Sequence, residues 1–188
     1  MIDENLMYPS FQTFFISTER SNCPLISNVI ITCKKFKEMG LLKDTTGIVS
    51  LSYGKRILIN GSNADLKDIK REDILEIVDY DPAKKIVLAI GRIEPHIETP
   101  VHWIIQHARN DVKAIIQLNG EKIIERFSKY LPVTEKEYPP GTLELAKEIL
   151  KMLRKSKRIA IKDRGVLFVG ASLKEVNDLI LKTYEEYK

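Results

Sequence analysis

The sequence contains few residues of the types that build disulfide scaffolds, repetitive chains or membrane spans. Its 188 residues include two cysteines, nine glycines and eight prolines. These low counts exclude a disulfide framework and a Pro/Gly-rich low-complexity chain. The longest apolar runs, such as residues 86–90, have only the length of a strand, so the sequence predicts no membrane span. A basic region followed by a long apolar stretch is also missing from the N-terminus, so we expect a cytoplasmic location.

Large blocks of charge of one sign are missing as well. The net charge of +4 is a small excess of 30 basic over 26 acidic residues, which is not typical of a nucleic-acid-binding protein. The densest basic run, residues 154–158, falls at the end of a predicted helix, where positive charge suits the helix dipole. Cys23 and Cys33 have no metal-ligand spacing, and we interpret them as reduced structural thiols.

The composition is that of one folded domain. With 44% apolar and 30% charged residues, the chain is long enough for a single core and too short to argue for two. We therefore predict one domain over residues 1–188. Residues 1–24, which carry Tyr8, Phe11, Phe14 and Phe15, form either a strand or an N-terminal arm that packs on a neighbouring subunit.

Hydrophobic periodicity and turn residues predict hairpins flanked by helices, which favours helices covering an antiparallel or mixed sheet. The predicted helices are residues 25–39, 100–109, 121–129, 143–153 and 173–187, and the predicted strands are residues 47–53, 55–60, 75–78, 85–91, 112–118, 159–162 and 166–169.

Candidate functional side chains are most frequent in residues 94–120, which hold all three histidines (His96, His102 and His107) and the only tryptophan. Thr99 followed by Pro100 predicts a helix start capped by the threonine hydroxyl, with Glu98 just ahead of it. The apolar stripe predicted for this helix is Val101, Ile104, Ile105 and Ala108, and that of the helix at 143–153 is Leu143, Ala146, Ile149, Leu150 and Leu153.

After this helix, Gln117 and Asn119 share one face of a strand, because side chains alternate along a strand. From the residues alone several interpretations stay open. Glu98 is a charge that favours a helix start or a catalyst, and His102 is a structural histidine or, with Glu98 and His96, part of a metal site. Gln117 and Asn119 are a polar pair at an edge, and His107 lies at the surface. The turn at Gly61 is weak evidence for a phosphate site, because turns need such residues anyway.

The order of these motifs resembles the class II aldolase and adducin family, which includes the fuculose-phosphate aldolases. The resemblance runs from about residue 25 to residue 187. It is carried by the pattern P-x-x-E-x-x-x-H at Pro95, Glu98 and His102, followed by the strand at 114–116, and by residues 47–50, 59–63, 140–142 and 164–165.

The resemblance implies an α/β fold, a three-layer α/β/α sandwich around a large, mostly antiparallel mixed sheet. It also implies a homotetramer with sites between subunits, and a sugar-phosphate ligand. In the family, three histidines hold a zinc ion that stabilises an enediolate, while the glutamate handles the proton.

The sequence departs from the family at the metal ligands. The three histidines fall on Gln117, Asn119 and Arg164. Amides bind zinc far more weakly than imidazole, and a guanidinium is a permanent cation that repels the ion, so we expect no metal cofactor. The residues at the family's phosphate contacts differ as well. Ile48 stands at the position of the family's asparagine, and His96 and Ile97 stand at the positions of its serine pair.

What survives is Glu98 at the family's acid or base position and Ser62 with Asn63 at the anion-binding turn. We therefore expect the Arg164 guanidinium to occupy the place of the metal and to pair with Glu98, with Gln117 and Asn119 completing the hydrogen bonding.

Three functions follow from this pattern. The first is a non-catalytic or small-anion-binding homologue. The alternative is a sugar-phosphate aldolase, lyase or epimerase that uses Glu98 as acid or base, and the third is an assembly module like the adducin head. If the protein is an enzyme, we expect an open pocket at Glu98. If the catalytic centre has been lost, we expect Arg164 to fill that pocket.

Overall fold

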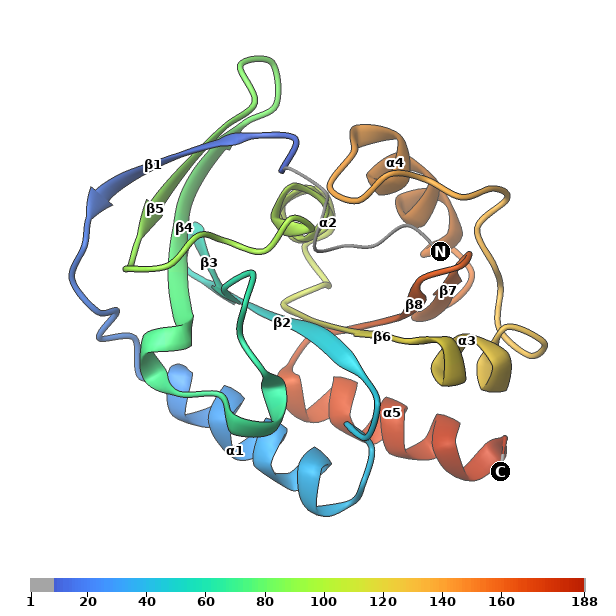
Figure 1. The fold of residues 1–188 in the computed structure, drawn as a ribbon. Coiled ribbons are helices and arrows are strands. Elements are labelled where there is room, and N and C mark those ends of the chain that lie inside the picture. Colours follow the sequence, from blue (N-terminus) through green and yellow to red (C-terminus); the bar gives the residue numbers. More distant parts are fainter. Residues whose placement is uncertain (1–8, 188) are drawn as a thin grey trace.

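An eight-stranded sheet organises the molecule, which the computed structural model describes for residues 9–187 (Figure 1). The strands lie in the order β1-β5-β4-β3-β2-β6-β8-β7. Neighbouring strands pair antiparallel except β1 and β5, which are parallel. The bounds are β1 Gln12–Ser17, β2 Thr46–Tyr53, β3 Arg56–Asn60, β4 Ile74–Asp81, β5 Ile86–Ile90, β6 Ala114–Asn119, β7 Arg158–Ile161 and β8 Gly165–Gly170.

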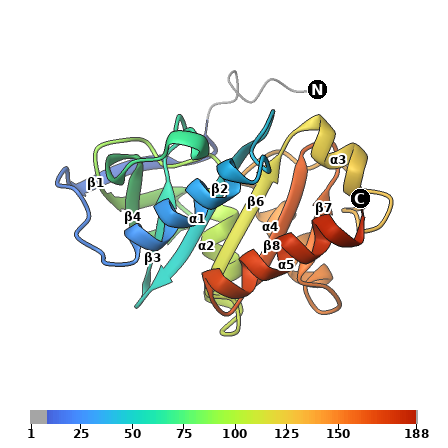
Figure 2. The same cartoon turned by 90° about the horizontal axis from the view of Figure 1, so that it is seen from below.

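Five helices cover the two faces of this sheet, as Figures 1 and 2 show. On one face lie α1 (Ile26–Glu38), α5 (Leu173–Glu186) and the short α3 (Glu121–Phe127), and on the other lie α2 (Thr99–Ala108) and α4 (Leu143–Met152). Two 3-10 turns, Leu66–Asp68 and Arg71–Asp73, connect β3 to β4. The predicted three-layer α/β/α sandwich around a mostly antiparallel mixed sheet is confirmed. No helix in residues 9–187 has the length and apolar character needed to cross a membrane.

The alternation of side chains along the central strand β6 divides the core in two. Ile116 and Leu118 pack under α1 and α5, while Ile115 packs under α2 and α4. Gln117 and Asn119 belong to the same face of β6 as Ile115, and both are buried. The sheet therefore carries two polar side chains into the layer between β6 and α2.

Three local predictions were wrong. Helix α2 begins at Thr99, so Glu98 and not Thr99 occupies the N-cap position. Ala108 is exposed at the last residue of α2. In α4, Leu143 is 42% exposed and Leu145 is buried in its place, because Leu143 is the first helical residue and its side chain does not reach the core.

The N-terminal arm is partly a strand. Gln12–Ser17 forms β1, which pairs with β5 at the edge of the sheet, and Phe11 is buried at its start. Phe14 and Ile16 on this strand are 48% and 59% exposed. Tyr8 lies outside the described residues.

Candidate functional site

Glu98 stands at the start of α2 with its carboxylate turned into the protein. Its backbone has φ −81° and ψ 0°, and its side chain makes no capping bond to the helix. The neighbouring Pro95 forms a bridge to Gly61, which ties this turn to the end of β3. The glutamate stands at the helix start but is only 1% exposed, so its charge is buried.

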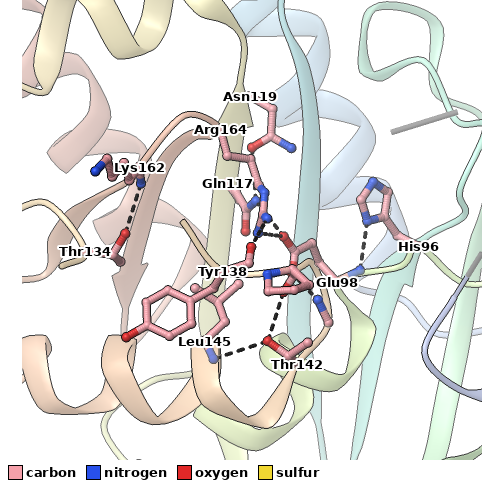
Figure 3. A network of polar contacts seen from close by, with 12 residues as sticks. His96, Glu98, Gln117, Asn119, Thr134, Tyr138, Thr142, Leu145, Lys162 and Arg164 are labelled. Carbon is pink, nitrogen blue, oxygen red and sulfur yellow. Dashed lines mark hydrogen bonds and ion pairs between the residues drawn. The ribbon is translucent and has the colours of Figure 1, made fainter. Parts of the chain in front are cut away.

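Three groups donate hydrogen bonds to this carboxylate (Figure 3). Arg164 Nη1 lies 2.7 Å from Oε1, and the backbone N–H of Gly141 lies 2.9 Å from Oε2. Gln117 Nε2 also donates to Oε1, at 3.4 Å. A buried carboxylate is costly unless it is paired and hydrogen-bonded, and here a cation and two neutral donors meet that requirement.

Arg164 reaches Glu98 from the turn between β7 and β8. Its side chain is 8% exposed, and Nη2 donates to the backbone oxygen of Tyr138. Asp163 before it has φ +57°, which turns the chain tightly between the two strands. The guanidinium is thus held by a carboxylate and a carbonyl at once, and this fixes its orientation.

Gln117 and Asn119 lie next to each other beside this ion pair. Gln117 Nε2 donates to Asn119 Oδ1 over 3.0 Å. Gln117 Oε1 and Asn119 Nδ2 are buried and have no hydrogen-bond partner among the described residues. We expected both amides to complete the hydrogen bonding of the Glu98–Arg164 pair. Gln117 does donate to Glu98, whereas Asn119 only accepts from Gln117.

These residues do not fit the family's zinc ion. The donor set is two amides beside a guanidinium, and that guanidinium already lies 2.7 Å from the carboxylate oxygen. Within residues 9–187 no group of three or more His, Cys, Asp or Glu side chains could hold a metal. The site made of His96, Glu98 and His102 that the sequence left open is thus not assembled.

His102 on α2 is a structural histidine in a buried hydrogen-bond chain. Ser50 Oγ on β2 accepts from Gln106 Nε2 over 2.6 Å and lies 2.7 Å from His102 Nδ1. Which of Ser50 Oγ and His102 Nδ1 donates depends on the tautomer of the imidazole, because the serine hydroxyl can donate or accept. Burial and the nearby His96 lower the pKa of His102 to about 3, although a contact with Gln117 acts in the opposite direction.

The other two histidines lie nearer the surface. His107 is exposed, as predicted, and stacks on Trp103 with ring centroids 3.8 Å apart. His96 is half-buried, and its Nδ1 accepts the backbone N–H of Glu98 over 3.1 Å. Burial and the nearby Arg164 lower the pKa of His96 to about 4, so this ring is neutral at pH 7.

A cavity of about 590 Å³ opens beside the ion pair. Ser62, Asn63 and His96 line it, whereas Glu98 and Arg164 do not. Its charged lining residues are Asp65, Lys67 and Glu94. Of the predicted site residues, the structure thus brings Glu98, Gln117, Asn119 and Arg164 together and places Ser62 and Asn63 in the adjacent cavity.

Sequence reasoning missed two contributions to the site, both from backbone groups. The Tyr138 carbonyl oxygen accepts from Arg164 and the Gly141 N–H donates to Glu98, and only Gly141 belonged to a motif, the one at residues 140–142. Gly141 has φ +68°, and a β-carbon there would lie 2.2 Å from the Ile97 carbonyl oxygen, so only glycine brings its N–H to Glu98.

This combination of a three-layer sandwich and a glutamate turned in from the start of α2 defines an aldolase-like domain. Residues 27–119, from α1 to the end of β6, match the family model for the Class II Aldolase and Adducin N-terminal domain. The chain belongs to this family. No curated protein matches it by sequence.

Solved structures extend the similarity in fold over most of the chain. An L-fuculose 1-phosphate aldolase is 23% identical with a TM-score of 0.71, and the match covers 89% of this chain and 84% of that one. The L-fuculose-1-phosphate aldolase of Thermus thermophilus is 19% identical with a TM-score of 0.66, covering 87% and 91%. The N-terminal class II aldolase domain of a conserved protein from Thermoplasma acidophilum is 16% identical with a TM-score of 0.61, covering 96% and 99%.

Proposed function

We propose that this class II aldolase homologue binds a small anion in the cavity at Ser62 and Asn63 and does not catalyse metal-dependent aldol cleavage. One observation carries the proposal. The cavity reaches the hydroxyl and amide of the anion-binding turn, while the glutamate that would move a proton is closed off behind it, 1% exposed and paired with Arg164. Binding and catalysis are thereby separated in space.

The chemistry of the two parts supports this division. Ser62 and Asn63 are exposed to the cavity and can donate hydrogen bonds to an anion there, while Lys67 lies 3.8 Å from the carboxylate of Asp65. Hydrogen bonds from such groups to an ionised ligand are stronger than bonds between neutral groups. Glu98 has a donor on each of its oxygens and no free path to a substrate proton, and a general base must come within hydrogen-bond distance of the proton it removes.

The alternative, a sugar-phosphate aldolase, lyase or epimerase that uses Glu98 as acid or base, requires Arg164 to leave the carboxylate. A cytoplasmic homotetramer stays part of the proposal, since sites between subunits are what the family resemblance implies. The adducin-like assembly role also stays a prediction, which the oligomeric state in solution tests.

Two measurements on the full chain test the proposal. Titration with inorganic phosphate and with L-fuculose 1-phosphate, followed by calorimetry, is expected to show binding that weakens about tenfold in the variant Ser62→Ala/Asn63→Ala, since it loses contacts to a charged ligand. The second measurement is the metal content of the untagged protein after incubation with zinc, manganese or cobalt. We expect no retained metal and no cleavage of L-fuculose 1-phosphate.

Two results would overturn the non-catalytic assignment. Retention of about one metal equivalent per chain, lost in Glu98→Ala or His102→Ala, would establish a working metal centre. Cleavage of L-fuculose 1-phosphate that disappears in Glu98→Gln would establish the enzymatic alternative. Binding that is equal in the wild type and in Ser62→Ala/Asn63→Ala would remove the anion site from this turn.

A further inference from the structure

His96 belongs both to the wall of the cavity at Ser62 and to the surroundings of the ion pair. Its Nδ1 accepts the backbone N–H of Glu98 over 3.1 Å. Burial and the nearby Arg164 lower the pKa of His96 to about 4, so the ring is neutral at neutral pH. In a neutral imidazole, a nitrogen that accepts a hydrogen bond carries no proton, and the other nitrogen is then the donor. The backbone of Glu98 therefore fixes His96 as a donor through Nε2.

The Nε2 edge of the His96 ring is the edge that a ligand can reach. Figure 3 shows Nδ1 turned to the backbone of Glu98 and Nε2 on the far side of the ring. The residue is half-buried and lines the cavity, and Nε2 makes no hydrogen bond to any residue from 9 to 187. His102 differs, because its Nε2 is buried out of reach of a ligand. The cavity thus contains an oriented N–H donor without a partner in the described chain.

The turn at Ser62 offers side chains to a ligand, whereas most of its backbone amides are already used. The Ser62 N–H donates to the Glu94 carbonyl oxygen over 3.0 Å, and the Ala64 N–H donates to the Gly61 carbonyl oxygen over 3.3 Å. A turn that binds a phosphate group presents successive backbone N–H groups to it. The available donors here are instead the neutral side chains of Ser62 and Asn63, together with His96 Nε2.

The charges around the cavity leave a small negative excess. Lys67 Nζ lies 3.8 Å from the Asp65 carboxylate, so these two charges largely compensate each other. Glu94 is exposed, lines the cavity and makes no ion pair within residues 9–187. Arg164, which lies near His96, is already paired with Glu98. A second negative charge on a ligand would therefore be repelled without a free cation to offset it.

We infer that His96 determines the ligand class of this cavity by donating from Nε2 to a singly charged carboxylate, which the cavity prefers to a doubly charged phosphate ester. A carboxylate has two acceptor oxygens, and the neutral donors of Ser62, Asn63 and His96 are sufficient for them. The volume of about 590 Å³ leaves room for a hydroxylated carbon chain beside the carboxylate. This inference rests on the proposed function, since it names the chemical class of the anion bound in the same cavity.

The position of the proton on His96 is tested first, on the full ¹⁵N-labelled chain without a ligand. Nuclear magnetic resonance spectra that correlate the ring nitrogens with the ring carbon-bound protons distinguish a protonated nitrogen from an unprotonated one. We expect the proton of His96 on Nε2 at about pH 8, because Nδ1 accepts the Glu98 N–H. A proton on Nδ1 would overturn the inference, since Nε2 would then be an acceptor and would repel a carboxylate oxygen.

Two ligands with the same number of carbon atoms test the preference for a carboxylate. D-glycerate and glycerol 1-phosphate are titrated into the wild type in a chloride buffer of constant ionic strength at about pH 8, where the phosphate ester carries two charges. Calorimetry gives the Kd values, and the amide signals of Ser62 and Asn63 locate the binding. We expect glycerate to bind about five- to tenfold more tightly. Equal or tighter binding of glycerol 1-phosphate would overturn the inference.

The variant His96→Asn removes the proposed donor and keeps the local turn. The asparagine amide oxygen stands near the position of Nδ1 and can accept the Glu98 N–H, but no group replaces Nε2. We expect the Kd for glycerate to rise about fivefold. His107→Asn, the same substitution near the other end of α2, is expected to leave this Kd unchanged. If the two variants bind glycerate equally well, Nε2 of His96 is not a ligand contact and the inference fails.

Glu94→Gln tests the contribution of charge to the preference. This variant removes the carboxylate that has no ion pair within the described residues, and it should reduce the preference for glycerate over glycerol 1-phosphate about threefold. An unchanged ratio of the two Kd values would show that charge does not set the ligand class.

The Ser62→Ala/Asn63→Ala variant separates this inference from the proposed function. If neither ligand binds the wild type, or if both bind this variant equally well, the proposed function fails and the inference fails with it. If glycerol 1-phosphate binds more tightly than glycerate and loses that binding in the variant, the anion site is established and only the inference is overturned.

Discussion

The guanidinium of Arg164 lies 2.7 Å from the carboxylate of Glu98, 66 residues away in the chain, and the two side chains are only 8% and 1% exposed. A buried ion pair loses much of its attraction to the cost of removing both charges from water. The pair therefore contributes little net stability, and its main effect is on the chemistry of the Glu98 carboxylate. It neutralises the carboxylate, and neither side chain lines the adjacent cavity.

Removing one member of the pair is expected to destabilise the protein more than removing both. Arg164→Met leaves the Glu98 carboxylate buried without a cation, which costs about 3–5 kcal/mol of the free energy of unfolding. The double variant Glu98→Leu/Arg164→Met leaves no buried charge and should lose less. Urea unfolding of the wild type, both single variants and the double variant measures this cycle. Independent, additive losses would mean that the two groups are not coupled.

Placing histidines at the positions of Gln117, Asn119 and Arg164 is expected to create a zinc site. Gln117 and Asn119 share one face of β6, and Asn119 pairs in register with Gly165, the neighbour of Arg164. The triple variant should retain about one zinc per chain by plasma mass spectrometry, since it supplies three imidazoles. Arg164→His alone supplies one imidazole and should retain none. Equal zinc in the wild type and the triple variant would refute the assignment of these positions.

Acid is expected to destabilise the fold through two histidines. His96 and His102 have pKa values of about 4 and 3 in the folded protein, below the ordinary value of 6.5. Between about pH 6 and pH 4.5 the unfolded chain therefore binds protons at these rings and the folded chain does not, so the free energy of unfolding falls as the pH falls.

The variant His96→Gln isolates one of these rings. Its amide oxygen can accept the Glu98 N–H, but it does not titrate. The slope of the unfolding free energy against pH gives the difference in bound protons between the unfolded and the folded chain. In this variant, measured by urea unfolding over the same range, that difference should be smaller than in the wild type by about one proton. An unchanged slope would show that His96 titrates normally in the folded state.

Gly141→Ala is expected to destabilise the protein more than Gly40→Ala, although both glycines have a similar positive φ, +68° and +73°. A β-carbon at Gly40 meets nothing within 4 Å, so that variant costs only the left-handed conformation, about 1 kcal/mol. A β-carbon at Gly141 would lie 2.2 Å from the Ile97 carbonyl oxygen. The backbone must shift there, which adds about 1–3 kcal/mol and moves the N–H away from Glu98.

Thermal unfolding of the two glycine variants measures this difference. Equal melting temperatures would mean that the segment at Gly141 adjusts freely, and the amide of Gly141 would then not be a fixed donor to Glu98.

Most helices and strands were predictable because they depend on local pattern. The predicted helix at 173–187 is Leu173–Glu186, and the predicted strand at 47–53 is Thr46–Tyr53. Periodicity is weakest at helix ends, where one residue decides the cap. The shift of the N-cap from Thr99 to Glu98 is of this kind.

The sequence by itself determined the order of the elements, the family, and which residue types stand at Glu98, Gln117, Asn119 and Arg164, because these follow from periodicity and motif spacing along the chain. Only the tertiary structure decided that Glu98 is closed off from the adjacent cavity, and that the backbone groups of Tyr138 and Gly141 hold the ion pair. Burial and hydrogen bonding depend on segments that meet across 43 and 66 residues of chain, and no local pattern encodes such a meeting.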